Sequence, residues 1–216
     1  MPHAFVRSKR QSRPRWHRRK AARPAEIVAA ALEVFVERGF AATRLADVAR
    51  RAGVTKGTVY LYFDSKEALF KAVVRETIVP VIAQGEDLAR SFTGSARDLV
   101  ERLVREYWRL VGETPLAGIQ KLMMAEAATF PDLTGFYYDE VVRRGHKLMA
   151  GVIERGIKNG EFRPMNVMVA AKLAMSPLIH AAVMRRAFAP CMPEGFNVQT
   201  YLDTHIELYL HGITKQ

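Results

Sequence analysis

The sequence predicts an all-α protein with an N-terminal three-helix helix-turn-helix domain and a larger C-terminal helical bundle. In nearly every segment after residue 23, apolar residues recur at the spacing of a buried helix face. Two short helical segments joined at a glycine lie in the first third of the chain. Hydrophobic residues make up 49% of the 216 residues, which is enough for a buried core. We expect an arm over 1–23, the helix-turn-helix domain over 24–75 and the bundle over 76–216.

The net charge of +11 is concentrated in the N-terminal arm, which we expect to be disordered. Residues 1–23 contain nine lysines and arginines and no acidic residue. Residues 24–75 carry eight basic and six acidic residues, and residues 76–216 carry sixteen of each. A concentrated positive field attracts nucleic acid or anionic lipid, so a polyanionic partner is expected at this end. A solvated tail is the alternative.

Several classes of protein find no support in the sequence. No run approaches the ~18 apolar residues of a membrane span, and the charged N-terminus does not match a secretory signal, so we expect a cytoplasmic protein without membrane contact. The single cysteine, Cys191, excludes an internal disulfide. The six histidines show no metal spacing, and no phosphate-binding loop or nucleophile motif occurs. We therefore expect no enzyme, no metal and no cofactor.

The first two helices are delimited by local signals. The first is expected over about 24–38, with Pro24 in its first turn and Gly39 at its end. Thr43 is expected to cap a short second helix, which Gly53 ends. The inward face of the first helix is formed by Ile27, Ala30, Ala31, Val34 and Phe35.

The next two helices begin at polar residues. Thr55 is expected to cap a short third helix that ends near Tyr62. Asp64, with Glu67 three residues later, predicts a capping box for a longer fourth helix. Pro80 is expected to bend or end that helix.

The third helix has an inward and an outward face. Ala49 is small where two helices would cross, Gly53 permits a left-handed turn, and Val59 points back into the junction. The remaining side chains are therefore expected to face outward: Lys56, Gly57, Thr58, Tyr60 and Tyr62. Such donors at the start of a helix suit phosphate oxygens and base edges, which predicts a recognition helix for the DNA major groove.

The stretch FAATRLADVARRAGVTKGTVYLYFDSKEALFKAVV resembles the DNA-binding domain of the TetR/AcrR family of bacterial transcriptional regulators. The turn, the KGTVYLYF helix and the SKEAL start of the next helix occur together at the family's spacing. The resemblance implies phosphate contacts by Thr43, Arg44, Tyr60, Tyr62 and Lys66, base-edge contacts by Lys56, Gly57 and Thr58, and inclusion of Thr55 in the site. Arg44 stands where the family often has a second threonine.

The C-terminal two-thirds is divided into helices by proline and glycine breaks. Helices are expected over 96–112, 116–129, about 131–159, 166–188 and 197–212. The family resemblance, weaker here, implies an effector-binding and dimerisation domain.

The last two of these helices are the expected homodimer surface, because reading a palindromic operator needs a two-fold axis. A small face on 166–188 and an apolar stripe on 197–212 would form it: Ala170, Ala171, Ala174, Ala181, Ala182, Val198, Tyr201, Leu202, Leu208 and Tyr209. Packing inside one monomer is the alternative.

A methionine-rich and aromatic set in this domain suits an apolar ligand pocket. We expect the pocket to include Trp108, Met123, Phe136 and His180, although such residues are more often plain core. The expected ligand is a small apolar or amphipathic molecule.

These observations predict a ligand-responsive repressor that binds operator DNA as a homodimer. A ligand preferring a splayed form would shift the dimer away from its DNA-competent state, with helix 64–79 carrying the change. An activator is also compatible with the family. The alternative is a helical protein whose basic arm binds RNA or a membrane surface. Such a protein has no need of a two-turn helix presented after a glycine turn.

Overall fold

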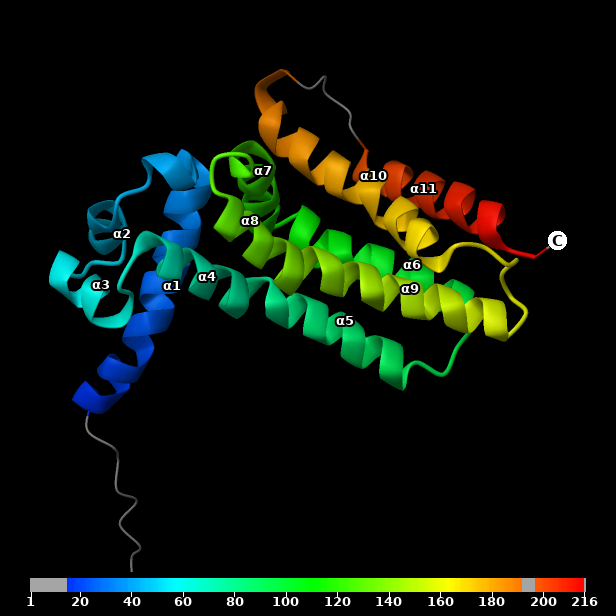
Figure 1. The fold of residues 1–216 in the computed structure, drawn as a ribbon, viewed down its shortest axis with the longest axis horizontal. Coiled ribbons are helices and arrows are strands. Elements are labelled where there is room, and N and C mark those ends of the chain that lie inside the picture. Colours follow the sequence, from blue (N-terminus) through cyan, green and yellow to red (C-terminus); the bar gives the residue numbers. More distant parts are fainter. Residues whose placement is uncertain (1–14, 192–196, 216) are drawn as a thin grey trace, which may run out of the picture.

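The computed structural model describes residues 15–191 and 197–215, and these form helices joined by short loops (Figure 1). The N-terminal helices are α1 (Arg15–Ala42), α2 (Leu45–Arg51), α3 (Lys56–Tyr62) and α4 (Lys66–Thr77). The remaining elements are α5 (Val79–Ser91), α6 (Ala96–Tyr107), η1 (Trp108–Gly112), α7 (Leu116–Glu126), α8 (Pro131–Tyr137), η2 (Tyr138–Val142), α9 (Arg143–Lys158), α10 (Val167–Ala187), η3 (Ala189–Cys191) and α11 (Val198–Ile213). Within the described residues the architecture is all-α, as predicted.

Helix α1 begins at Arg15, nine residues before the predicted start at Pro24. Helix α1 therefore extends into the predicted arm over 15–23, and the other residues of that arm lie outside those described. The segment before Pro24 is rich in Arg, Lys and Ala, which are strong helix formers, so the helix extends through the proline. Gly39 interrupts the helix as predicted, with φ of 81°.

Of the N-terminal caps of α2, α3 and α4, only that of α3 is the predicted residue. The Thr55 hydroxyl accepts a hydrogen bond from the Thr58 amide at 3.1 Å, which confirms it as the cap of α3. Thr43 does not cap α2, because Arg44 occupies the cap position. Ser65, one residue after the predicted Asp64, caps α4 by accepting from the Ala68 amide.

One apolar core joins the first four helices to part of the C-terminal domain. Phe35, Phe40 and Phe70 pack with ring centroids 5.3 to 5.8 Å apart. Phe130, just before α8, packs edge-on against Phe40 at 4.8 Å. The predicted boundary at residue 75 is thus crossed by continuous apolar packing. The helix-turn-helix and part of the bundle therefore share one core.

The C-terminal helices fall close to their predicted ranges. Helices α6 and η1 run without a break over 96–112, and α8, η2 and α9 do so over 131–158. Helix α4 ends at Thr77, and Pro80 lies in the first turn of α5, an element that was not predicted. A second core lies among these helices, with Leu99, Ile153 and Leu210 fully buried.

Helix α10 is long and apolar enough, by length and composition, to cross a membrane. This corrects the expectation that no segment approaches a membrane span. Seven of its residues are buried in the protein core, and core helices of folded domains meet the same criterion.

Candidate nucleic-acid interface and ligand cavity

The turn between α2 and α3 fixes the direction of α3. Gly53 adopts φ of 64°, a left-handed conformation that favours glycine. The Val54 amide then donates to the Ala49 carbonyl at 2.9 Å, which closes the turn. Val59 is completely buried and anchors α3 in the N-terminal core. The opposite face of α3 is left toward solvent.

The outward face of α3 exposes three of the predicted DNA contacts. Lys56 and Gly57 are exposed, and Tyr60 is 46% exposed. The Lys56 ammonium lies 5.5 Å from the centroid of the Tyr60 ring. Thr58 is half-buried, with its hydroxyl hydrogen-bonded to that of Thr55 at 2.9 Å. The face combines donors, an aromatic ring and a glycine that permits close backbone approach.

Leu61 was not singled out from the sequence, yet it is 73% exposed on α3. Single exposed leucines are common on protein surfaces, and here Leu61 adds an apolar group beside the exposed Tyr60. Its position between Tyr60 and Tyr62 gives the only sequence signal, because Val59 and Phe63 occupy the inward positions.

Three predicted phosphate contacts are placed differently from the expectation. Thr43 is only 2% exposed and donates its hydroxyl to the Gly39 carbonyl at 2.6 Å, so the turn after α1 removes this hydroxyl from the surface. Tyr62 is half-buried against the N-terminal core instead of facing outward. Lys66 donates from Nζ to the carbonyls of Phe40 (2.7 Å) and Ala41 (3.0 Å). Arg44, in contrast, is exposed.

Surface ion pairs tie α2 to α1. Arg51 pairs with Glu33 at 2.6 Å and with Glu37 at 2.7 Å, and Arg38 pairs with Asp47 at 2.8 Å. Hydrogen bonding to the Arg51 guanidinium holds the pKa of Glu37 below its usual value. These acids are thus neutralised by neighbouring arginines. Their negative charge is therefore screened from any polyanion bound to α3.

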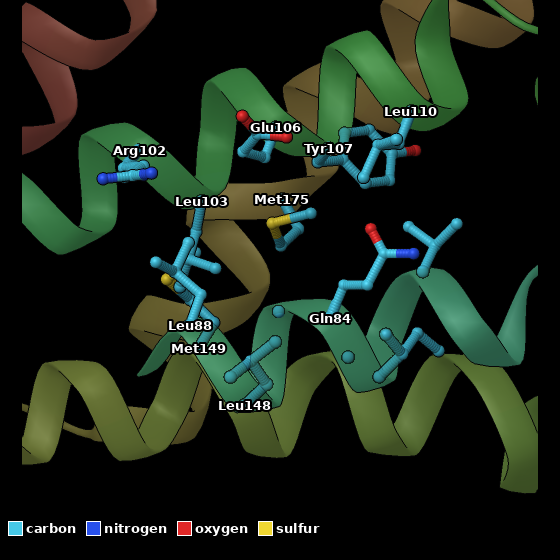
Figure 2. Close-up of a pocket in the computed structure, with 14 residues that line it drawn as sticks. Gln84, Leu88, Arg102, Leu103, Glu106, Tyr107, Leu110, Leu148, Met149 and Met175 are labelled. Atoms are coloured by element: carbon cyan, nitrogen blue, oxygen red, sulfur yellow. The ribbon is translucent and has the colours of Figure 1, made fainter. Parts of the chain in front are cut away.

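A separate apolar cavity of about 300 Å³ lies between α5, α6, α9 and α10 (Figure 2). Its walls are mainly aliphatic side chains and methionines, with a few polar groups. They are Val81, Ile82, Gln84, Gly85, Leu88, Arg102, Leu103, Glu106, Tyr107, Leu110, Gly145, Leu148, Met149 and Met175. Such a lining is typical of a small-molecule site.

The four residues predicted for the pocket do not line this cavity. Trp108 and Met123 are buried in core packing, and His180 is exposed on α10. Phe136 is half-buried beneath the cations of Lys71 and Arg75, at 5.4 and 5.0 Å from its centroid. Helical periodicity identifies buried faces, but it does not separate a packed core from a cavity wall.

Polar groups enter the cavity from two walls. Figure 2 shows Gln84 on α5 directed toward Tyr107 on α6. The Tyr107 hydroxyl donates to Oε1 of Gln120 at 2.9 Å, and burial raises the pKa of this phenol. Arg102 and Glu106 also line the cavity from α6. An amphipathic ligand would find a mostly apolar chamber with a small number of fixed polar contacts.

Two connections link the cavity domain to the helix-turn-helix. Glu126, at the end of α7, accepts a hydrogen bond from the Ala41 amide at 3.1 Å. Gly118 in α7 packs so closely on α1 that an added Cβ would lie 2.5 Å from Cγ1 of Val36. The turn after Gly39 is therefore held from α7 by Glu126 and from α4 by Lys66.

The residues predicted for the dimer surface are mostly buried inside the monomer. The alanines of α10 named above are buried within the monomer, and the Tyr201 and Tyr209 hydroxyls donate to carbonyls of α10 at 2.9 Å. These residues serve the monomer core, because α11 packs directly on α10. Other apolar side chains remain outside: Leu173 is 60% exposed and Leu208 is 70% exposed.

No group of three or more His, Cys, Asp or Glu that could hold a metal occurs in the described ranges 15–191 and 197–215.

Comparison with known proteins identifies both parts of the chain. A family model described as bacterial regulatory proteins, tetR family, matches residues 27–73, and a model described as tetracyclin repressor-like, C-terminal domain, matches residues 92–192. The HTH-type transcriptional repressor KstR2 of Rhodococcus jostii is 27% identical over 144 residues, covering 67% of this chain and 70% of that protein. The uncharacterized HTH-type transcriptional regulator YfiR of Bacillus subtilis is 30% identical over 155 residues, covering 68% and 71%.

The fold also resembles solved structures. The transcriptional regulator FadR from Bacillus subtilis, solved in complex with stearoyl-CoA, superposes with a TM-score of 0.74 at 20% identity. The match covers 88% of this chain and 98% of that one.

Proposed function

This chain belongs to the TetR family of bacterial transcriptional regulators and is a ligand-responsive repressor; we propose that it binds a palindromic operator as a homodimer through α3. The supporting observation is the division of α3 into two faces. Val59 is fully buried while Lys56, Gly57 and Tyr60 are exposed, so a rigid helix presents donors to a partner. Access to the chromosome implies a cytoplasmic location.

The proposed roles of the residues follow from their placement. Lys56, Gly57 and Thr58 lie at the start of α3, the end that enters the major groove in helix-turn-helix proteins. Tyr60 and the exposed Arg44 are assigned to phosphate oxygens, and Leu61 to an apolar contact such as a thymine methyl group. We assign Thr55, Thr43 and Lys66 to holding α3 and the preceding turn in place. Tyr62 supports α3 from the core side.

We assign the homodimer interface to the outer faces of α10 and α11. Two recognition helices must be placed about 34 Å, or a multiple of that, apart to read a palindrome, which requires a two-fold axis. A variant with Leu173→Glu and Leu208→Glu should be monomeric by light scattering and lose specific DNA binding. Met124→Glu, at a similarly exposed position on α7, is the control and should remain dimeric.

The effector is assigned to the cavity between α5, α6, α9 and α10. Its aliphatic and methionine lining suits an apolar chain, and Gln84, Arg102 and Tyr107 could orient a polar end. FadR of Bacillus subtilis, which shares the fold, has been solved with stearoyl-CoA. A fatty acyl compound is therefore the class to test first.

We assign the transmission of ligand binding to the helix-turn-helix to α4 and α5 together. Helix α4 begins where Lys66 holds the turn after α1, and α5 continues from its end to line the cavity. A ligand that binds better when α5 is displaced would pull on this connection. Only such a difference in affinity between two arrangements can shift the population.

To test this function, the affinity of the protein is measured for labelled duplex DNA, single strands and anionic vesicles at one salt concentration. Duplex fragments selected from genomic DNA should bind more tightly than random duplex, single strands or anionic vesicles, and a variant with Lys56→Ala and Tyr60→Ala should lose the preference. Equal binding of single-stranded RNA or vesicles, unaffected by that variant, would support the basic arm as the binding element instead.

A further inference from the structure

A second cleft, of about 420 Å³, lies between the helix-turn-helix domain and the ligand domain. Helix α1 contributes Val36 to it, and α7 contributes Gly118 and Lys121. Its other lining residues come from the end of η1 and from the end of α10 and η3: Gly112, Glu113, Arg185, Arg186 and Ala189. It shares no lining residue with the apolar cavity. We call it the α1–α7–α10 cleft.

The charges around this cleft are unbalanced. The lining includes three cations, Lys121, Arg185 and Arg186, and a single carboxylate, that of Glu113. Ion pairs are frequent elsewhere on the surface, yet within the described part of the chain none involves these three cations. The Arg185 guanidinium instead lies 5.7 Å from the centroid of the Trp108 ring.

Arg186 is the least satisfied of the three cations. Its terminal nitrogen donates to the carbonyl oxygen of Thr114, but its buried Nε has no hydrogen-bond partner among the described residues. Burial, and secondarily the neighbouring Arg185, lowers the pKa of this guanidinium. A buried donor on a charged group without an acceptor is costly, and two adjacent guanidinium groups repel each other. A bound anion would offset the repulsion between the two guanidinium groups.

We propose that the α1–α7–α10 cleft binds a phosphate-bearing small molecule. Two adjacent arginines offer planar forks of donors that match phosphate oxygens, and Lys121 on α7 adds a third positive charge. Glu113 can accept a hydrogen bond from a hydroxyl group of such a ligand. The assignment does not depend on which ligand fills the apolar cavity.

The position of the cleft gives this binding a structural consequence. Its walls belong to α1, which supports the helix-turn-helix, and to α7 and α10 of the ligand domain. An anion bridging Lys121 to the two arginines would hold α7 and α10 together beside α1. The cleft would thereby sense or fix the arrangement of the two domains.

The first experiment uses the Trp108 indole as a reporter. The chain has two tryptophans, so Trp16→Phe leaves Trp108 as the single source of indole fluorescence. Inorganic pyrophosphate should change its emission saturably, because phosphate binding would alter the cation beside the ring. Sodium chloride at matched ionic strength should not. No saturable change with pyrophosphate would overturn the proposal.

The second experiment locates the site by calorimetry with pyrophosphate. Lys121→Gln with Arg185→Gln should weaken binding about tenfold or more, since two charge-assisted contacts are removed. The control variant, Arg143→Gln with Lys147→Gln on α9, removes the same charge outside the cleft and should bind as the unaltered protein does. Equal affinity in the two variants would show an adventitious ion only, and would overturn the proposal without affecting the DNA-binding function. If the first variant does not fold, Arg185→Lys, which keeps the charge but loses the fork, replaces it.

Discussion

Replacing Lys66 with methionine separates a structural role from a DNA contact. The family resemblance implies that Lys66 binds phosphate, whereas the structure has its ammonium donating to the Phe40 carbonyl at 2.7 Å and the Ala41 carbonyl at 3.0 Å. The ammonium also lies 4.5 Å from the centroid of the Phe40 ring. All three contacts hold the turn after α1. The structure therefore predicts that Lys66→Met mainly destabilises the protein.

The size of the loss follows from these contacts. A hydrogen bond to a charged group contributes about 1.5 to 3 kcal/mol, and a cation over an aromatic ring about 0.5 to 2 kcal/mol. The bond to Ala41 is exposed and counts at the low end, and the ordered lysine loses side-chain entropy. We expect the free energy of unfolding to fall by about 2 to 4 kcal/mol.

Urea denaturation followed by circular dichroism measures this loss, and DNA affinity at several salt concentrations measures the phosphate contacts. Arg44→Met is the matched variant, because Arg44 is exposed and was also predicted to bind phosphate. It should change stability by less than about 0.5 kcal/mol but reduce the logarithmic salt slope by about 1.8 for two contacts per dimer. If Lys66→Met left stability unchanged and reduced the salt slope instead, the structural assignment of Lys66 would be refuted.

Three further predictions address the cavity, the domain junction and the arm. Gly145→Leu should fill the cavity, because Gly145 lines it and has open space at its Cβ, and should abolish ligand binding while leaving operator affinity intact. Gly151→Leu, on the exposed side of the same helix, is the control and should bind ligand as the unaltered protein does. Titration calorimetry with a fatty acyl compound measures the binding in both variants. Gly118→Ala should destabilise the protein by about 1 to 3 kcal/mol through its clash with Val36, and Val36→Ala in the same chain should recover part of that loss in a urea titration. Deleting residues 2–14 removes four basic residues ahead of α1 and should lower affinity for all DNA sequences alike with a smaller salt slope; an unchanged slope would indicate a solvated tail.

Local signals made the helices of this protein predictable. Gly39 interrupts the first helix, Gly53 follows the second in a left-handed conformation, and Thr55 caps the third, each as predicted. These effects act within a few residues of the chain. The prolines and glycines of the C-terminal domain act in the same way. Helix α5 was missed because Pro80 was interpreted as a break, although proline is equally suited to a first turn.

The apolar cavity could not be predicted, because its walls come from helices far apart in the sequence. Met123, Met149 and Met175 all lie in methionine-rich helical segments, yet Met149 and Met175 line the cavity whereas Met123 packs in the core. The difference depends on how α5, α6, α9 and α10 are spaced, which periodicity does not contain. Thr43 is a second example: its hydroxyl donates to the Gly39 carbonyl and is buried, which the sequence pattern does not indicate.

The central claim is that the exposed face of α3, presented twice by a homodimer, reads duplex DNA. Hydroxyl-radical footprinting on a genomic fragment retained by the protein tests it most directly. We expect two protected regions related by a dyad and about one helical turn, or a multiple of it, apart, and both should be lost when Lys56 and Tyr60 are replaced by alanine. A single asymmetric footprint, or protection that survives this replacement, would contradict it.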